Sequence, residues 1–156
     1  MALNRATEGR VYPPTEPYEV GREKIREYAR AIRDDNPAYW DPAAARALGH
    51  PDVIAPPSFP MVISLEAERQ VVLDPEVGAS NVTRFVHREQ RFAYNRPIHA
   101  NDVLTVQVKI AKIDAVGEND VVTFESRITG EGGEHICTAR STFVAFDPSQ
   151  RSPVPA

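Results

Sequence analysis

The side chains best placed for chemistry in this chain follow one amphipathic segment. Arg33-Asp34-Asp35-Asn36-Pro37-Ala38-Tyr39 ends that segment with short polar residues and a proline. Asp34 and Asn36 thus stand where a helix stops, and scaffolds often present reactive or binding groups at such a place. A structural interpretation stays open, because the residue before proline avoids the α region and Asp-Asn-Pro alone can end a helix.

A second candidate site is the Ser58-Phe59 segment, at the start of a strongly apolar stretch. The first N–H groups of a buried helix lack acceptors within the helix, and its dipole favours negative charge. Such a terminus can polarise a carbonyl oxygen. Alternatively, the Ser58 hydroxyl caps the helix and satisfies those donors itself.

His87 and Gln90 lie in a polar, strand-like segment, and two interpretations of them remain. They form one wall of a ligand pocket, or His87 is a histidine on a sheet surface. The remaining histidines share no metal-ligand spacing with one another or with a cysteine, so no metal is expected. No Gly-x-Ser-x-Gly motif surrounds Ser58 or Ser64, and no glycine-rich phosphate loop occurs, so neither serine-hydrolase chemistry nor a nucleotide cofactor is expected.

Composition narrows the class of protein. The chain has 156 residues, a net charge of −4 and a pI of about 5.6, which gives no electrostatic signature of nucleic-acid binding. No apolar run is long enough for a membrane span. The lone Cys137 cannot form an internal disulfide and suits a cytoplasmic location. Its alternating apolar surroundings indicate a small core residue rather than a nucleophile.

Helical patterns occupy the first half of the chain. A helix is expected over about 22–33, with Gly21 as its N-cap and an apolar stripe formed by Ile25, Tyr28, Ala29 and Ile32. Asp41-Pro42 and Gly49 delimit a short second helix. A third is expected over about 59–73 with Ser58 as N-cap. Because the first half of this third helix is apolar nearly all round, we expect it to be buried.

Strand patterns occupy the second half. The run Val82–Tyr94 alternates imperfectly, which indicates a bend or bulge, and regular strands follow over about 104–110, 122–128 and 135–146. Helices followed by an antiparallel meander predict an α+β domain. A sheet that wraps one apolar helix is the arrangement of a hot-dog fold. We expect a flexible arm at 1–10, one domain over 11–146 and a disordered tail at 147–156.

Four separated blocks resemble the MaoC-like dehydratases, most closely an actinobacterial branch with the HadA- and HadC-type subunits of (3R)-hydroxyacyl-ACP dehydratase. The resemblance spans about residues 10–146, and its blocks are 20–29, 34–39, 54–59 and 86–92. Catalytic members carry Gly-Asp-x-Asn-Pro-x-His. Here Asp34, Asn36 and Pro37 match that motif, whereas its glycine falls on Arg33 and its histidine on Tyr39. Pro57-Ser58 replaces a His-Gly pair of active members.

The resemblance implies a hot-dog fold, pairing of two such domains, and reversible hydration of trans-2-enoyl thioesters of CoA or ACP. Tyrosine, with a pKa near 10, is a poor base at neutral pH, so the chain alone should be weak or inactive. The leading hypothesis is a subunit that shapes the acyl groove while a MaoC-like partner supplies an Asp/His pair. The expected catalytic residues are Asp34, Asn36 and Tyr39, and the expected substrate-binding residues are Trp40, Ser58, Phe59, Met61, His87 and Gln90.

Two other hypotheses stay open. In the first, the chain is a self-sufficient hydratase homodimer that uses Asp34, assisted by Tyr39 or His87. In the second, it is a non-enzymatic module that binds acyl thioesters. A hot-dog thioesterase would also fit the fold, but fold alone does not define a chemistry.

Overall fold

The computed structural model describes residues 3–82 and 84–146. Its helices are α1 (Arg22–Ala31), α2 (Pro42–Ala47) and α3 (Met61–Leu73), with short 3₁₀ turns η1 (Arg5–Thr7), η2 (Pro37–Tyr39), η3 (Ala79–Asn81) and η4 (Glu131–Gly133). Its strands are β1 (Tyr18–Glu19), β2 (Arg84–Tyr94), β3 (Val103–Val116), β4 (Asn119–Thr129) and β5 (His135–Phe146). The tail predicted at 147–156 lies outside the described residues.

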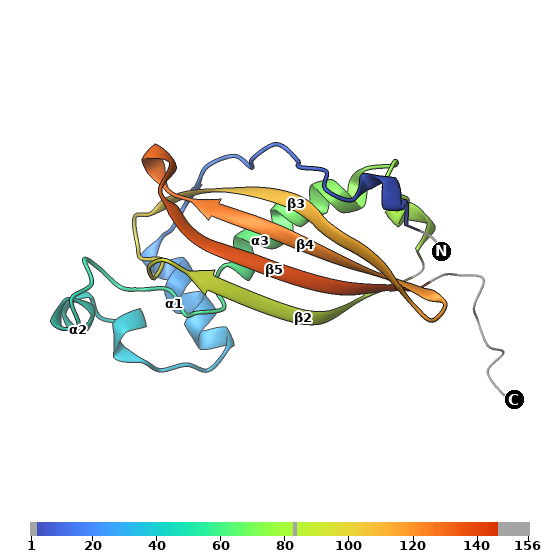
Figure 1. The fold of residues 1–156 in the computed structure, drawn as a ribbon. Helices are drawn as coiled ribbons and strands as arrows, with labels where there is room; N and C mark the ends of the chain where they lie inside the picture. Colours follow the sequence, from blue (N-terminus) through green and yellow to red (C-terminus); the bar gives the residue numbers. More distant parts are fainter. Residues whose placement is uncertain (1–2, 83, 147–156) are drawn as a thin grey trace, which may run out of the picture.

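The five strands form one antiparallel sheet in the order β1-β3-β4-β5-β2. Figure 1 shows the long sheet curling along α3, with α1 and α2 gathered at one end. This arrangement confirms the predicted α+β hot-dog fold. The bulge expected in the run 82–94 is present, because the pairing of β2 with β5 shifts register between His87 and Glu89.

The core lies between α3 and the concave face of the sheet. On β3, Leu104, Val106, Val108 and Ile110 are buried and alternate with more exposed residues, as the period of a half-buried strand requires. Cys137 is fully buried, which raises the pKa of its thiol to about 11. Its interpretation as a core residue is therefore confirmed.

The N-terminal segment differs from the loose arm expected at residues 1–10. Leu3 is buried, and its N–H donates to Asp120 Oδ2 at 3.0 Å. The Gly9 N–H donates to the Ile110 carbonyl at 2.8 Å, and Tyr12 continues this contact along β3. Residues 3–12 thus cover the far end of the core. Sequence patterns missed this because the contacts join residues about a hundred positions apart.

The start of α3 also differs from expectation. The helix begins at Met61 after Pro60, and the Ser58 side chain does not cap it. Instead the Ser58 hydroxyl accepts a hydrogen bond from the Tyr28 hydroxyl at 2.9 Å. Nor is α3 buried on every side, since Leu65 is 46% exposed and Val72 is 40% exposed. The described residues 3–82 and 84–146 leave one face of the helix uncovered.

The end of α1 sets the position of Asp34. The Arg33 N–H donates to the Arg30 carbonyl and the Asp34 N–H to the Ala29 carbonyl, which is the Schellman pattern at a helix C-terminus. Arg33 occupies the left-handed residue of this pattern, with φ of 57°. A left-handed conformation suits glycine, so the arginine is strained at the position where the MaoC motif has glycine.

Arg33→Gly is therefore expected to stabilise the chain by about 0.5–1 kcal/mol. Relief of about 1–2 kcal/mol of left-handed strain is partly offset by the greater backbone entropy of glycine in the unfolded chain. Urea unfolding measures the change. Arg33→Ala is the matched control, because alanine keeps the strain and should leave stability almost unchanged. Equal effects of glycine and alanine would contradict the explanation.

Candidate active site

The loop between α1 and α3 carries the candidate catalytic residues, and α1 holds it in place. Arg22 forms a bidentate ion pair with the buried Asp52, in which Nε donates to Oδ1 at 2.9 Å and Nη2 to Oδ2 at 2.6 Å. This pairing lowers the pKa of the Asp52 carboxyl. The Arg26 guanidinium donates to the Trp40 carbonyl at 3.2 and 3.0 Å. The loop is thus fixed to α1 near both ends.

Within the loop, short polar side chains hold the backbone. Asp34 Oδ1 accepts from the Asn36 N–H at 3.2 Å, and Asn36 Oδ1 accepts from the Ala38 N–H at 3.0 Å and caps η2. Asn36 thus begins η2, whereas α1 has already ended at Ala31 through the turn at Arg33. The η2 turn places Tyr39 inward, with only 6% of its surface exposed.

Tyr39 lines a pocket of about 340 Å³ between the loop and the end of β2. The pocket is mostly apolar, and its lining includes Ile54, Pro57, Tyr94 and Arg96. The Tyr94 hydroxyl donates to the Pro57 carbonyl at 2.7 Å and so joins β2 to the start of α3. Pockets with apolar walls and a few convergent polar groups are the usual form of small-molecule sites.

The phenol of Tyr39 stays protonated at neutral pH. Burial raises its pKa above the ordinary value of 10, and the nearby negative charge of Asp34 raises it further, with a partial offset from Asn36. The Asp34 carboxylate and the phenol are thus close enough to interact. Tyr39 can donate or accept a hydrogen bond here, but it cannot serve as a base near pH 7.

The segment before α3 leaves one backbone donor available. The Phe59 N–H donates to the Pro56 carbonyl at 2.9 Å, and the Met61 N–H donates to the Ser58 carbonyl at 3.1 Å. Prolines 56, 57 and 60 have no N–H. Within the part of the chain that the structure describes, the Ser58 N–H has no acceptor, so it is the candidate donor to a carbonyl oxygen.

The expected substrate-binding residues do not form one group. The Arg30 guanidinium carbon lies 5.4 Å from the centroid of the Trp40 ring, and the indole N–H of Trp40 donates to the Asp34 carbonyl. Phe59 is fully buried and packs edge-on against the Tyr28 ring, and Met61 is half-buried at the first residue of α3. Trp40, Phe59 and Met61 are not among the residues that line the Tyr39 pocket. Their role in binding stays a prediction.

His87 and Gln90 lie elsewhere on β2. His87 is exposed and stacks on Phe143, with ring centroids 4.7 Å apart. Gln90 reaches the core, where its Oε1 lies 2.9 Å from Ser141 Oγ. Neither residue lines the Tyr39 pocket. The interpretation of His87 as a surface strand residue fits this placement.

Tyr94 and Tyr28 were missed by the sequence reasoning, although both reach the segment before α3. Tyr28 was assigned only to the apolar stripe of the first helix, and Tyr94 only to the end of a strand. Their hydroxyl groups could have indicated such contacts in the sequence, because a buried tyrosine hydroxyl normally needs a hydrogen-bond partner.

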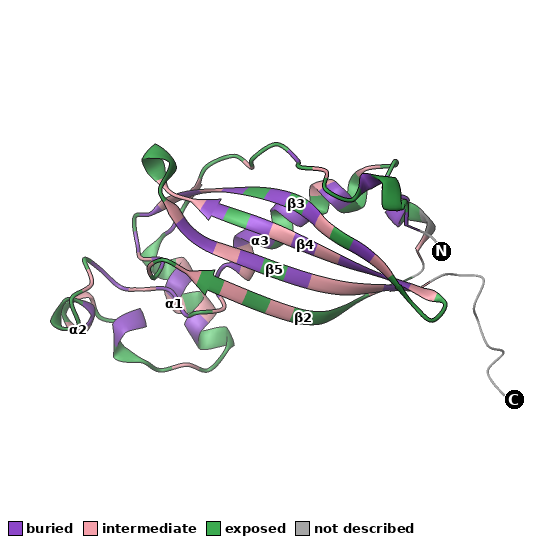
Figure 2. Ribbon diagram, in the orientation of Figure 1, coloured by how far each residue is buried: buried purple, intermediate pink, exposed green. Residues whose placement is uncertain are grey.

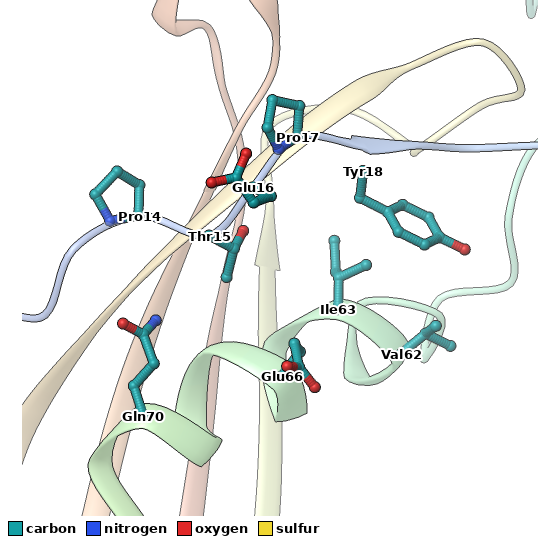
Figure 3. Close-up of a pocket in the computed structure, with 9 residues that line it drawn as sticks. All are labelled: Pro14, Thr15, Glu16, Pro17, Tyr18, Val62, Ile63, Glu66 and Gln70. Carbon is teal, nitrogen blue, oxygen red and sulfur yellow. The ribbon is translucent and has the colours of Figure 1, made fainter. Parts of the chain in front are cut away.

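A larger hollow, about 590 Å³, lies between residues 14–18 and α3. Figure 3 shows the residues of the extended segment facing Val62, Ile63, Glu66 and Gln70 of the helix. None of the loop residues 34–40 lines it, and it carries the exposed carboxylates Glu16 and Glu66. We therefore place the candidate site at the smaller pocket, which Tyr39 of the 34–39 loop lines.

Across the described residues, no group of three or more His, Cys, Asp or Glu side chains is arranged to hold a metal ion. No helix among those same residues has the length and apolarity to cross a membrane.

The curled sheet around α3, together with the Asp34-x-Asn36-Pro37 loop, defines a MaoC-like hot-dog protein. The chain belongs to the family described as FAS1-like, dehydratase domain region, whose model matches residues 6–139. It is 52% identical over 145 residues to a UPF0336 protein of Streptomyces avermitilis, covering 93% of this chain and 96% of that protein.

Two solved structures are similar in fold and sequence. A MaoC-like dehydratase superposes with a TM-score of 0.87 at 35% identity, covering 96% of this chain but only 45% of that one. The chain therefore spans about half the length of that neighbour. The HadBC (3R)-hydroxyacyl-ACP dehydratase complex of Mycobacterium tuberculosis superposes with a TM-score of 0.79 at 27% identity. The match covers 92% of this chain and 99% of the matched chain.

Proposed function

We propose that this protein is one subunit of a (3R)-hydroxyacyl-thioester dehydratase, in which a MaoC-like partner chain supplies the Asp/His pair. The observation that carries the proposal is Tyr39, a buried phenol that lines the pocket at the histidine position of the motif. A group that stays protonated at neutral pH cannot take a proton from water. The similarity to a dehydratase of twice the length and to a two-subunit dehydratase supports the pairing.

Dehydration of a 3-hydroxyacyl thioester removes a proton from the α-carbon and gives one to the departing hydroxyl. In the proposed complex the partner's Asp/His pair performs these transfers. This chain's pocket holds the acyl part against Ile54 and Pro57, and the Ser58 N–H is available to a thioester oxygen. Asp34 and Tyr39 would orient the substrate or a water molecule rather than carry the proton.

The test is co-expression with the MaoC-like protein encoded nearest to this chain. The isolated chain should hydrate crotonyl-CoA at least about 10² times more slowly than the copurified pair, since a missing general base typically costs 10²–10⁴ in rate. Turnover by the isolated chain on the order of 10 s⁻¹, typical of enzymes, would overturn the proposal.

A self-sufficient hydratase is the second candidate, because Asp34 lies close enough to Tyr39 to affect its pKa. The Asp34→Asn variant distinguishes the self-sufficient hydratase from the proposed two-chain enzyme. It should abolish turnover by the isolated chain if Asp34 is the working base. In the proposed pair it should leave most of the turnover, because the partner's base is intact.

A further inference from the structure

The Ser58 N–H belongs to a peptide group that the local turns leave without backbone partners at both ends. The Phe59 N–H donates to the Pro56 carbonyl at 2.9 Å, which closes a β-turn with Pro57 and Ser58 at its centre. Proline suits the second position of such a turn, because its φ is already fixed. Within the described residues, no backbone group bonds to the Pro57 carbonyl or to the Ser58 N–H. These two groups are the opposite ends of one peptide group.

Tyr94 binds one end of this peptide group. Its hydroxyl donates to the Pro57 carbonyl at 2.7 Å, and both residues line the Tyr39 pocket. Tyr94 is the half-buried last residue of β2, which Figure 2 shows in pink and green along its length, and it pairs with Cys137 of β5. Burial raises the pKa of its phenol above the ordinary value of 10, so the hydroxyl stays protonated and remains a donor. The sheet thus holds this donor at the wall of the pocket.

A hydrogen bond to the Pro57 carbonyl acts on the Ser58 N–H in two ways. The peptide group between them is planar and trans, so its C=O and N–H point in opposite directions. Holding the carbonyl therefore fixes the direction of the N–H. The bond also polarises the peptide group, and hydrogen bonds linked through one group strengthen each other by about 10–30%. Tyr94 thus controls both the direction and the strength of the Ser58 donor.

Tyr28 offers an internal comparison, because its hydroxyl reaches the same segment but a different peptide group. Its oxygen lies 2.9 Å from Ser58 Oγ and 3.1 Å from the Ser58 carbonyl oxygen. That carbonyl belongs to the next peptide group, whose N–H on Phe59 is already bonded to the Pro56 carbonyl. Loss of the Tyr28 hydroxyl therefore loosens the segment without removing the polarisation of the Ser58 N–H.

We propose that Tyr94 is a positioning residue that acts through the Pro57–Ser58 peptide group: it directs and strengthens the N–H that binds the thioester oxygen. This inference rests on the proposed function, in which the Ser58 N–H has that role. Negative charge builds on the thioester oxygen in the transition state, where a fixed donor acts most strongly. Tyr94 therefore affects the rate of the chemical step more than the binding of the substrate.

The first test is Tyr94→Phe in the pair copurified with the nearest-encoded MaoC-like chain. Phenylalanine keeps the ring and removes one oxygen, so the variant should fold, which thermal unfolding checks. Loss of a whole oxyanion donor costs about 10²–10³ in kcat, so weakening a donor that remains should lower kcat for crotonyl-CoA about tenfold and change KM less than about threefold.

Tyr28→Phe is the matched control, because it removes a hydroxyl from the same segment but not from the Pro57–Ser58 peptide group. It should lower kcat by no more than about threefold. An unchanged kcat in a folded Tyr94→Phe pair, or an equal loss in Tyr28→Phe, would overturn the inference.

The second test needs no turnover. Butyryl-CoA has the thioester but no double bond to hydrate, and an isotope label in its carbonyl makes the C=O stretch visible by difference infrared spectroscopy. A hydrogen bond lowers the frequency of that stretch. We expect a lowered frequency for butyryl-CoA bound to the isolated chain and to the pair. Tyr94→Phe should lose part of this shift, and Tyr28→Phe should keep it.

The two tests separate failure of this inference from failure of the proposed function. A carbonyl shift that Tyr94→Phe leaves unchanged would overturn the role of Tyr94 alone. Absence of a shift in the wild type would overturn the role of the Ser58 N–H and this inference with it. Turnover by the isolated chain as fast as that of the pair would overturn the proposed function, whereas the infrared comparison would still decide the role of Tyr94.

Discussion

Tyr39→His is expected to give the isolated chain crotonyl-CoA hydration at least about 10² times faster than the wild-type chain. Tyr39 is buried against the pocket beside Asp34, and Asn36 fixes the turn that places it there. Histidine is smaller than tyrosine, so it fits the same space. With an ordinary pKa of about 6.5 it can take a proton from water near pH 7.

Two controls define this gain. Tyr39→Phe removes the hydroxyl without adding a base and should stay as slow as the wild type. Asp34→Asn combined with Tyr39→His should lose the gain, because the histidine and the carboxylate act on the same water. Steady-state hydration of crotonyl-CoA measures all three variants. No gain in a folded Tyr39→His protein would show that more than a missing base limits this site.

Glu68→Gln is expected to stabilise the isolated chain by about 3 kcal/mol at pH 8.5 and to have little effect at pH 4. The folded chain holds the Glu68 pKa at about 7, chiefly through burial, against an ordinary value of 4.5. The neutral carboxyl is therefore favoured in the fold. Its contribution to stability is complete below pH 4.5 and is lost as the pH rises through about 7. That difference in pKa corresponds to about 3 kcal/mol.

Urea unfolding across this pH range measures the effect. Glu66→Gln is the matched control, because Glu66 lies two residues away on the exposed side of α3 and should leave the pH profile unchanged. If Glu68→Gln and the wild type lose stability in parallel between pH 4.5 and 8, Glu68 is not held neutral by burial.

The candidate site combines a well-defined backbone turn with reactive groups that differ from the MaoC motif at two positions. The loop has a Schellman turn at Arg33, a cap at Asn36 and a buried Tyr39, and its Asp34, Asn36 and Pro37 match the MaoC motif. Two of its chemical positions differ, because arginine replaces glycine and tyrosine replaces histidine. We expect the first difference to cost stability, and under the proposed function the second leaves the loop without a base. A subunit that positions substrate for a partner requires the loop but not the base.

The sequence by itself determined the features that depend on neighbouring residues. Gly21 and Asp41 mark the starts of α1 and α2, and the alternation of Leu104, Val106 and Val108 marks a half-buried strand. Periodicity and capping act over a few residues, so a single pattern is enough to predict them. The sequence also showed the loop motif and the tyrosine that stands at its histidine position, Tyr39.

Only the tertiary structure decided where isolated polar groups find their partners. Ser58 has the right type and position for a helix cap, but Tyr28 from another helix competes for its hydroxyl. Residues 3–10 have no strong local pattern, yet β3 and β4 bind them. Glu68, Gln90 and Ser141 meet although up to 73 positions separate them. Such contacts depend on how distant segments pack, because no spacing along the chain encodes them.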